Sequence, residues 1–357
     1  MTTNNLTNLT IVKEIKDIPR TLSVVKNLYD KIEKLAMNIS GEEVYEFIYT
    51  GCGSSYYAAI KSSYPLLSSP IKILALPASE ALWIISRKYR NKSARRIITV
   101  LSRSGETAEI KALVINAKSD KRNIVVGFSC NPNSFLASNS DYAITIEDCM
   151  EESVYMTKSF VTLSLLGTIF SVKLMEYLGY EKPMNELEDE LEALIEISKA
   201  LVSDFNTPMQ LSKILTNRYP IIVLGTEDLY SIALEAALKF IEVSYTMAIA
   251  LHALEFRHGY TGLLEYPNLS LIILSNANSA SYLYVERLYT ELKSAGINVV
   301  HISNSKSGDY VIDTRYMPHL GTLAYIIPLY YTTVFRALSL GYNPAEPRHV
   351  VKIVTRF

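Results

Sequence analysis

The chain has 357 residues, of which 49% are hydrophobic and 20% charged, so it can bury a large interior and does not have the composition of a disordered protein. Lysine plus arginine number 35 and aspartate plus glutamate number 36, which excludes both a basic surplus for nucleic acid and an acidic solvating tail. This length predicts two domains of ordinary size or one large α/β domain.

Cysteine content and segment composition predict a cytoplasmic protein with no membrane span. The three cysteines, too few for a disulfide framework and therefore typical of a reducing compartment, are Cys52, Cys130 and Cys149. Residues 1–5 are polar and lack the basic and apolar regions of a signal segment. No uncharged apolar run reaches about 18 residues. The longest candidate, residues 320–340, contains Arg336 and predicts a buried amphipathic helix.

Hydrophobic periodicity in the first half predicts five short strands that alternate with helices. The predicted strands are residues 46–50, 71–76, 96–101, 123–128 and 142–146. Helical spacing follows the first strand through residues 55–62 and resumes at Glu106 after the third. Strands separated by helices of this length form βαβ units, so we expect a parallel sheet.

The second half repeats this pattern after an acidic helical stretch at residues 184–201. Its predicted strands are residues 220–225, 269–275 and 297–302, with a long helix at 229–251 and another closing the half. The predicted divisions are an N-terminal segment (1–20), a first domain (21–183), a second domain (184–345) and a tail (346–357). The two halves share architecture more than residues, which suggests a duplication.

The first chemical motif lies where the first strand gives way to a helix. Its sequence is Gly51-Cys52-Gly53-Ser54-Ser55-Tyr56. Small residues let the backbone approach a ligand, and a helix N-terminus offers N–H groups to an anion. A serine that caps a helix after a turn glycine produces the same pattern, and that reading stays open.

A second hydroxyl-rich turn follows the third strand, with the sequence Ser102-Arg103-Ser104-Gly105-Glu106-Thr107. Three hydroxyls and a set of turn N–H groups match the oxygens of a phosphate monoester. Helix-start chemistry is the alternative. Ligands of open α/β sheets bind at the carboxyl ends of the strands, so two such turns together favour a phosphate site. Neither turn has the Gly-Lys-Ser/Thr ending of a nucleotide P-loop.

Charged residues in three further segments are candidates for catalysis. Lys239 and Glu242 share a helix face, either as an exposed ion pair or as charges within an apolar setting. His258 precedes a glycine. Such a histidine can interact with the dipole at a helix end, or it can act as a proton shuttle. Lys352 is flanked by valines and isoleucine, which predicts packed surroundings and a lowered pKa, although a tail lysine is usually solvated.

Taken in order, these segments resemble the sugar isomerase (SIS) superfamily, most of all the isomerase lobe of glucosamine-6-phosphate synthase. They are joined by Thr157-Lys158 within residues 154–160, and the resemblance covers nearly the whole chain. It implies two SIS domains, each a parallel five-stranded sheet flanked by helices in a three-layer α/β/α sandwich. It also implies a hexose or hexosamine 6-phosphate substrate and a homodimer, and it brings no cofactor, metal, nucleic acid or membrane partner.

Residue by residue, the resemblance implies the following roles. Glu242 matches the carboxylate that moves a proton between C1 and C2, and His258 matches a ring-opening residue that reaches in from a partner subunit. Lys352 matches the Schiff-base lysine of a mobile tail, and Lys239 a lysine near the sugar hydroxyls. The implied substrate-binding residues are Gly53, Ser54, Ser55, Ser102, Arg103, Ser104, Thr107 and Val154, of which the last offers its backbone.

Several positions depart from the synthase pattern. Arg103 stands where the synthase has a neutral amide, and it suggests either an added phosphate contact or a different substrate. Tyr155 and Met156 replace small residues, which suggests a reshaped pocket. His349 replaces an amide residue, and residues 226–228 are more acidic than the second-domain turn of the synthase. The glutaminase domain of the synthase has no counterpart in the sequence, and its absence favours a reaction that needs no channelled ammonia.

The resulting hypothesis is a deaminase and isomerase that converts glucosamine 6-phosphate to fructose 6-phosphate and ammonia. Three alternatives remain open. They are the isomerase subunit of a split synthase, a deglycase acting on fructosamine phosphates, and a non-catalytic sugar-phosphate sensor. Glu242, His258 and Lys352 together favour an enzyme over a sensor, because a binding module does not need all three.

Overall fold

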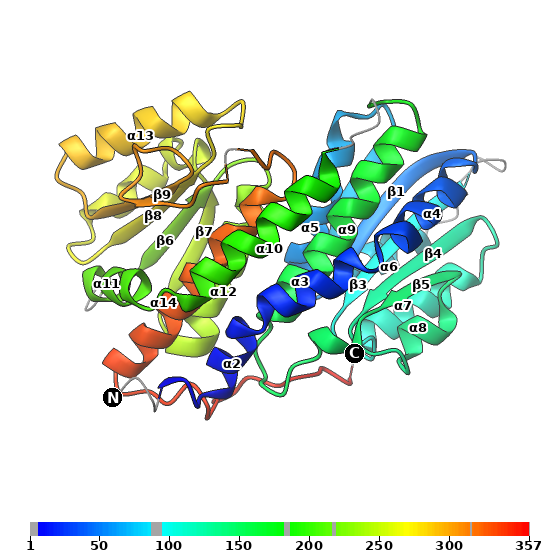
Figure 1. The fold of residues 1–357 in the computed structure, drawn as a ribbon, viewed down its shortest axis with the longest axis horizontal. Coiled ribbons are helices and arrows are strands. Elements are labelled where there is room, and N and C mark those ends of the chain that lie inside the picture. The colour runs from blue at the N-terminus through cyan, green and yellow to red at the C-terminus, as the bar shows by residue number, and fades with distance from the viewer. Residues whose placement is uncertain (1–5, 87–94, 182–185, 216–218, 315, 357) are drawn as a thin grey trace. The chain divides into compact units, whose positions relative to one another are not determined.

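The computed structural model describes residues 6–86, 95–181, 186–215, 219–314 and 316–356, which form two compact units (Figure 1). The first-sheet unit comprises Arg20–Glu152, Met156–Leu191 and Val351–Phe357. The second-sheet unit comprises Met1–Pro19, Ser153–Tyr155 and Glu192–Val350. The domain boundaries drawn from the sequence stay predictions.

The sheet of the first-sheet unit contains five parallel strands in the order β2-β1-β3-β4-β5. The strands are β1 (Val44–Gly51), β2 (Lys72–Pro77), β3 (Arg95–Ser102), β4 (Asn123–Ser129) and β5 (Tyr142–Thr145). Each coincides with a predicted strand to within two residues, since buried β-branched runs bounded by turn residues mark them clearly.

Helices cover both faces of this sheet (Figure 1). One face packs against α6 (Ala78–Ser86), α7 (Ala108–Lys118) and α8 (Phe135–Asn139). The other carries α4 (Tyr29–Ser40), α5 (Ser54–Ser63) and α9 (Lys158–Tyr177). Among the residues that the structure describes, α9 alone is long and apolar enough to cross a membrane, but 94% of its apolar window is buried, as in a core helix.

The second sheet also contains five parallel strands, in the order β10-β9-β8-β6-β7. The strands are β6 (Ile221–Gly225), β7 (Ala248–His252), β8 (Ser270–Ser275), β9 (Val299–Ser303) and β10 (Tyr310–Val311). Numbered within its own half, each sheet has the order 2-1-3-4-5 when read from one edge. The predicted fold class, two parallel five-stranded sheets flanked by helices, is confirmed, and the shared strand order supports the suggested duplication.

The helix predicted at residues 229–251 was too long, because its last residues form a strand. Helix α12 spans Leu229–Ser244 and ends at Tyr245, which has the left-handed backbone angle φ of 50°. The chain then turns into β7. Ala, Leu and Met favour helices, and a short apolar run carries no periodicity that separates a strand from a helix, so the sequence pattern missed this break.

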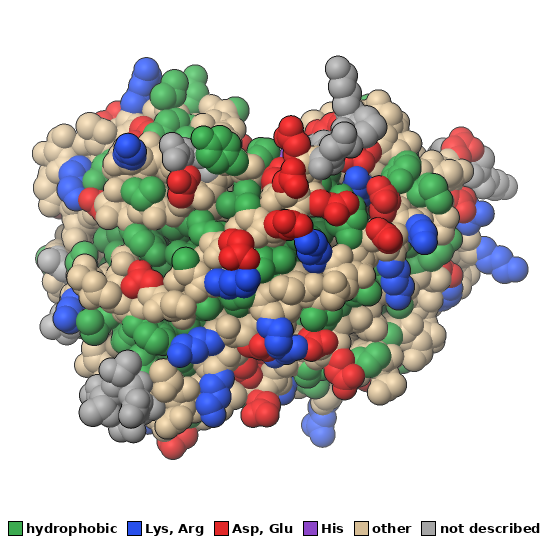
Figure 2. Space-filling model, in the orientation of Figure 1, with side chains coloured by type: hydrophobic (Ala, Val, Ile, Leu, Met, Phe, Trp, Pro, Cys, Tyr) green, Lys and Arg blue, Asp and Glu red, His purple; other side chains and the backbone are tan. Residues whose placement is uncertain are grey.

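The remaining helices complete the second-sheet unit and the connections. Helix α13 (Tyr282–Ser294) packs on one face of the sheet, and α14 (Ile326–Ser339) packs with α12 and with α11 (Asn206–Ile214). The others are α2 (Thr10–Lys16), α3 (Ile18–Lys26) and α10 (Leu187–Ser203). The acidic residues of α10 are mostly exposed, and Figure 2 shows both signs of charge on the face that it displays.

A disulfide joins Cys130, which follows β4, to Cys149, which follows β5. The expectation that the cysteines are all reduced is therefore wrong for this pair. Spacing in the sequence cannot reveal such a bond, because it depends on β4 and β5 being neighbours in the sheet. Cys52 is the free cysteine, and burial, followed by the charge of Glu109, raises the pKa of its thiol to about 12.

We predict that replacing Cys130 by serine lowers the free energy of unfolding by about 3 kcal/mol, because the bond closes a loop of about 20 residues. Thermal unfolding of the oxidised protein and its Cys130→Ser variant measures the difference. A Cys52→Ser variant is the control, and its melting temperature is expected to keep the full response to reductant. Equal melting of the oxidised and reduced wild type would contradict the prediction.

Candidate substrate site

The two hydroxyl-rich turns lie at neighbouring strand ends in the first-sheet unit. Residues 51–56 follow β1 and residues 102–107 follow β3, and these strands pair in parallel. The chain leaves β1 toward β2 on one side, and it leaves β3 toward β4 on the other. This is the switch point at which open parallel sheets bind their ligands.

Glycine is required in the first turn because α5 begins so close to the strand. A Cβ atom on Gly51 would lie 2.5 Å from the backbone carbon of Ser55. Gly53 has a φ of 54°, which reverses the chain into α5. Ser54 and Ser55 form the first turn of this helix, and the Ser55 hydroxyl donates to the Met156 sulfur at 3.6 Å. The N-terminus of α5 therefore places two serine hydroxyls at the end of β1, while the N–H groups of Ser55 and Tyr56 donate to the carbonyls of Cys52 and Gly53.

The second turn uses its hydroxyls as acceptors within the loop. Ser102 Oγ accepts from the Gly105 N–H at 3.0 Å, and Ser104 Oγ accepts from the Glu106 N–H at 3.2 Å. Each hydroxyl keeps its own proton for another acceptor. Thr107 precedes α7 and makes no side-chain capping bond. The turn-forming role and the phosphate-binding role are therefore compatible.

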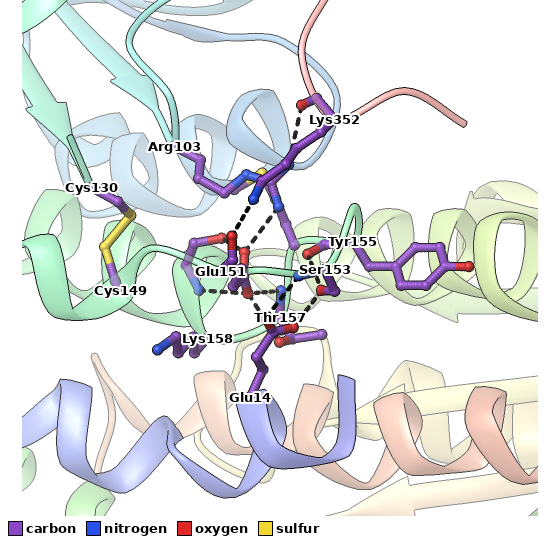
Figure 3. Close-up of polar contacts among 12 residues, drawn as sticks. Glu14, Arg103, Cys130, Cys149, Glu151, Ser153, Tyr155, Thr157, Lys158 and Lys352 are labelled. Carbon is purple, nitrogen blue, oxygen red and sulfur yellow. Dashed lines mark hydrogen bonds and ion pairs between the residues drawn. A yellow bond between two sulfur atoms is a disulfide. The ribbon is translucent and has the colours of Figure 1, made fainter. Parts of the chain in front are cut away.

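Arg103 lies with its guanidinium against Glu151 (Figure 3). Its Nη1 is 3.1 Å from Glu151 Oε2, and its Nη2 donates to the backbone carbonyl of Lys352 at 3.2 Å. The side chain is 6% exposed. In this structure the arginine therefore joins a carboxylate and the tail, and its proposed contact with a phosphate stays untested.

Sequence analysis missed Glu151, which organises the loop between β5 and α9. Its carboxylate is fully buried and accepts from the N–H and hydroxyl of Thr157 at 2.5 and 3.0 Å. It also accepts from the N–H and hydroxyl of Ser159 at 3.2 and 2.5 Å. The available signal was a glutamate followed by hydroxyl residues six and eight positions later, at the start of a helix.

The surroundings of Lys352 are not packed, contrary to the prediction. Lys352 is exposed, and its neighbours Val351 and Val354 are 67% and 46% exposed. Its ammonium donates to the backbone carbonyls of Glu151 and Glu152, the second at 3.3 Å. Flanking apolar residues failed as a signal because the tail here lies on the surface of the first-sheet unit.

In the second-sheet unit, Lys239 is buried between two carboxylates of α12. Its ammonium lies 2.5 Å from Glu242 Oε2 and 3.2 Å from Glu235 Oε1, and the side chain is 1% exposed. Burial alone would lower the pKa of Lys239, but the two carboxylates outweigh it and the pKa is raised. The alternative of an exposed ion pair is therefore wrong. Sequence analysis missed Glu235, although its spacing of four residues from Lys239 is a pairing signal.

The other predicted residues of this unit lie as follows. Glu242 is one-fifth exposed, which leaves its carboxylate accessible. His258 follows the 3₁₀ turn Glu255–Arg257 and is exposed. Val154 is half-buried, and the neighbouring Tyr155 is buried. Burial, with the charges of Tyr245 and Glu242, raises the pKa of the Tyr155 phenol, so this substituted position lies in the electrostatic environment of Glu242.

The structure thus places the predicted residues in two groups. The first-sheet unit holds Gly53, Ser54, Ser55, Ser102, Arg103, Ser104, Thr107 and Lys352, and the second-sheet unit holds Val154, Lys239, Glu242 and His258. Within the described ranges, no group of three or more His, Cys, Asp or Glu side chains is arranged to hold a metal ion.

The equivalent switch point of the second sheet is occupied by the chain's own carboxylates. Glu227 accepts from the backbone N–H of Ser281 at 2.9 Å, at the N-terminus of α13. Asp228 accepts from the Thr322 hydroxyl at 2.6 Å. A carboxylate at a helix N-terminus takes the place that an anion would fill. This arrangement explains the acidic departure at residues 226–228 and favours the first sheet as the phosphate site.

Comparisons with known proteins agree with the fold. The chain is 29% identical to glutamine–fructose-6-phosphate aminotransferase (isomerizing) from Buchnera aphidicola, over 96% of this chain and 58% of that relative. The chain spans little more than half the length of the curated relatives that it matches.

Two solved structures are matched over nearly their whole length. Glucosamine-6-phosphate deaminase from Thermotoga maritima has a TM-score of 0.74 at 24% identity, covering 97% of this chain and 99% of that one. The C-terminal domain of glucosamine-fructose-6-phosphate aminotransferase from Francisella tularensis has a TM-score of 0.79 at 21% identity, covering 94% and 97%. Residues 46–172 match the family model described as SIS domain. The part of the chain that contains most of the first sheet therefore matches a SIS domain.

Proposed function

We propose that this protein isomerises and deaminates an amino-sugar phosphate, converting glucosamine 6-phosphate and water to fructose 6-phosphate and ammonia. The observation that carries the proposal is the α12 cluster, in which the buried Lys239 ammonium holds the accessible Glu242 carboxylate. An accessible carboxylate that is held in place by a cation can remove a proton from a carbon next to a carbonyl and return it.

The turns of the first sheet support binding of the substrate's phosphate. Ser55, Ser102, Ser104 and Thr107 provide hydroxyls at the ends of β1 and β3. These donors match a phosphate monoester without demanding a metal. The matched SIS domain and the relatives named isomerizing aminotransferases make a phosphorylated sugar the best-supported substrate class.

In the proposed reaction, Glu242 removes the proton from C2 of the open-chain amino sugar and returns it to C1. The electron pair of the C2–H bond forms an enolamine, and protonation at C1 leaves an imine at C2. Water hydrolyses the imine to the ketone and releases ammonia. Lys239 holds the Glu242 carboxylate by a hydrogen bond and stabilises charge on a substrate oxygen. General acid–base catalysis of this kind contributes about 10²–10⁴-fold in rate.

We assign His258 to opening of the sugar ring and Lys352 to stabilising charge or forming a Schiff base. The exposure of His258 supports its donation to a second copy of the chain, so we propose a homodimer. A cytoplasmic location is part of this proposal, because sugar phosphates are cytoplasmic metabolites.

The curated relatives favour a second candidate, since they are named as aminotransferases. In that case, the same proton transfer runs from fructose 6-phosphate and ammonia toward the amino sugar. The two directions share Glu242 and the phosphate turns, so they differ in the preferred reactants and not in the site.

We expect the purified protein to release ammonia and fructose 6-phosphate in equal amounts from glucosamine 6-phosphate. Coupled assays measure both products, and the unphosphorylated amino sugar is the control, which the phosphate site should reject. A faster reaction from fructose 6-phosphate and an ammonium salt would favour the second candidate. Absence of turnover in both directions would overturn the proposal.

A further inference from the structure

Arg103, Glu151 and Lys352 form a closed ring of contacts within the first-sheet unit (Figure 3). The Arg103 guanidinium pairs with the Glu151 carboxylate, and it also donates to the backbone carbonyl of Lys352. The Lys352 ammonium returns to the backbone carbonyl of Glu151. Each residue therefore contacts the other two, although they lie in a turn, a loop and the tail.

The Glu151 carboxylate is held in place by several hydrogen bonds. This buried carboxylate accepts from both the backbone and the hydroxyl of Thr157 and Ser159, which start α9. A buried carboxylate needs a nearby cation, and Arg103 supplies it. The position of the guanidinium is thus set through Glu151 by the start of α9.

The backbone of Arg103 is also held in place. Its carbonyl accepts from the Cys130 N–H at 3.2 Å and from the Ser129 hydroxyl at 3.3 Å. Both the backbone and the guanidinium of Arg103 are therefore held in place. The planar guanidinium uses one nitrogen, Nη1, for Glu151 and a second, Nη2, for the tail, whereas a lysine would present a single nitrogen on a shorter side chain to both acceptors.

The tail makes a further contact beside the same turn. The backbone carbonyl of Val354 accepts from the Ala108 N–H at 3.0 Å, at the start of α7. Residues 352–354 therefore lie along the loop of residues 102–108, which contains the proposed phosphate donors. The contacts of Arg103 and Ala108, together with those of the Lys352 ammonium, hold the exposed tail there.

We propose that Arg103, aligned by Glu151, is the positioning residue that holds the tail and aims the Lys352 amine beside the phosphate turn. The catalytic role of Lys352 rests on the proposed function. The role of Arg103 in holding the tail does not depend on that function. Arg103 stands where the synthase has a neutral amide. In this proposal it acts through the tail and is not a phosphate ligand.

The test compares Arg103→Lys with the wild type. The substitution keeps a cation for Glu151, so the fold is expected to survive, but it removes the second nitrogen that reaches the tail. Trypsin cuts after Lys352, and we expect cleavage there to become about tenfold faster, because a hydrogen bond from a charged donor is lost. Mass spectrometry follows the released peptide, and thermal unfolding checks the fold.

Two further variants make the result decisive. The double variant Arg103→Gln, Glu151→Gln removes both charges, leaves no unpaired buried ion, and is expected to release the tail equally. Lys118→Gln removes a lysine that pairs with Asp141 at the far end of α7, and it should leave cleavage unchanged. Wild-type cleavage in the folded Arg103→Lys protein, or acceleration by Lys118→Gln as well, would overturn the proposal.

Kinetics separates this role from phosphate binding. If the protein turns over glucosamine 6-phosphate, Arg103→Lys should lower kcat about tenfold at nearly constant KM, since the hydroxyl donors are intact. A large rise in KM with unchanged tail cleavage would instead indicate that Arg103 binds the phosphate, and it would contradict the positioning role. If no sugar phosphate reacts, the cleavage experiment still decides whether Arg103 holds the tail.

Discussion

Replacing Glu242 by glutamine is expected to lower kcat for glucosamine 6-phosphate by about 10²–10⁴-fold, with KM nearly unchanged. The amide can still accept the hydrogen bond from Lys239, so the α12 cluster should keep its geometry. It cannot take a proton from C2 or return one to C1. Steady-state kinetics measures the loss, and a substrate deuterated at C2 adds a second readout, because deuterium carried to C1 of the product reports the transfer directly.

A matched control for this variant exists on α10. Glu196 also pairs with a lysine three residues away, Lys199, at 2.6 Å, but both side chains are largely exposed. Glu196→Gln should leave kcat at the wild-type value. If Glu242→Gln retained full turnover, or if deuterium still entered C1 at the normal rate, Glu242 would not be the proton carrier.

The first sheet could be predicted from the sequence because each of its signals is local. Buried β-branched runs, turn glycines and hydroxyls at strand ends place both turns at β1 and β3 without any knowledge of tertiary contacts. The strand order then brings the turns together, since β1 and β3 are neighbours. The proposed phosphate site therefore rests on local pattern plus one rule of sheet topology.

The second sheet was harder because two of its strands are weak at the sequence level. The β7 segment contains Ala248 and Ala250 in a run that continues the apolar composition of α12. The β10 strand has only two residues, Tyr310 and Val311, so it shows no alternation. Both strands exist because neighbouring strands offer them hydrogen bonds, which is a tertiary effect that no window of sequence contains.

The missed site residues have the same physical origin. Glu151 matters because Arg103 and the start of α9 converge on it, and the Cys130–Cys149 bond depends on β4 lying beside β5. The apolar neighbours of Lys352 led to the prediction that its surroundings are packed. Whether a tail segment is buried depends on the tertiary structure around it and not on its own residues. Local pattern therefore finds candidate ligand-binding groups, and tertiary contacts decide which residues hold those groups in place.

Replacing Lys239 by methionine is expected to destabilise the protein by about 3–5 kcal/mol, because it leaves the fully buried Glu235 carboxylate without its cation. The folded-state pKa of Lys239 is raised above its ordinary value of 10.5, so the contribution of its ammonium to stability is fully present at pH 7 and is lost only as pH rises above 10.5. Chemical denaturation at pH 7 measures the change in the free energy of unfolding.

A second substitution tests the cause of this loss. In the double variant Lys239→Met, Glu235→Gln, the uncompensated charge is gone and the Tyr330 hydroxyl can still donate to the amide oxygen at position 235. We expect it to recover more than half of the lost stability, while activity stays low because Glu242 lacks its cation. Lys199→Met, which breaks the exposed pair on α10, should cost at most about 1 kcal/mol. A similar cost for Lys199→Met and Lys239→Met would show that burial adds nothing to the α12 cluster, and it would remove the physical basis for assigning Lys239 and Glu242 to the chemistry.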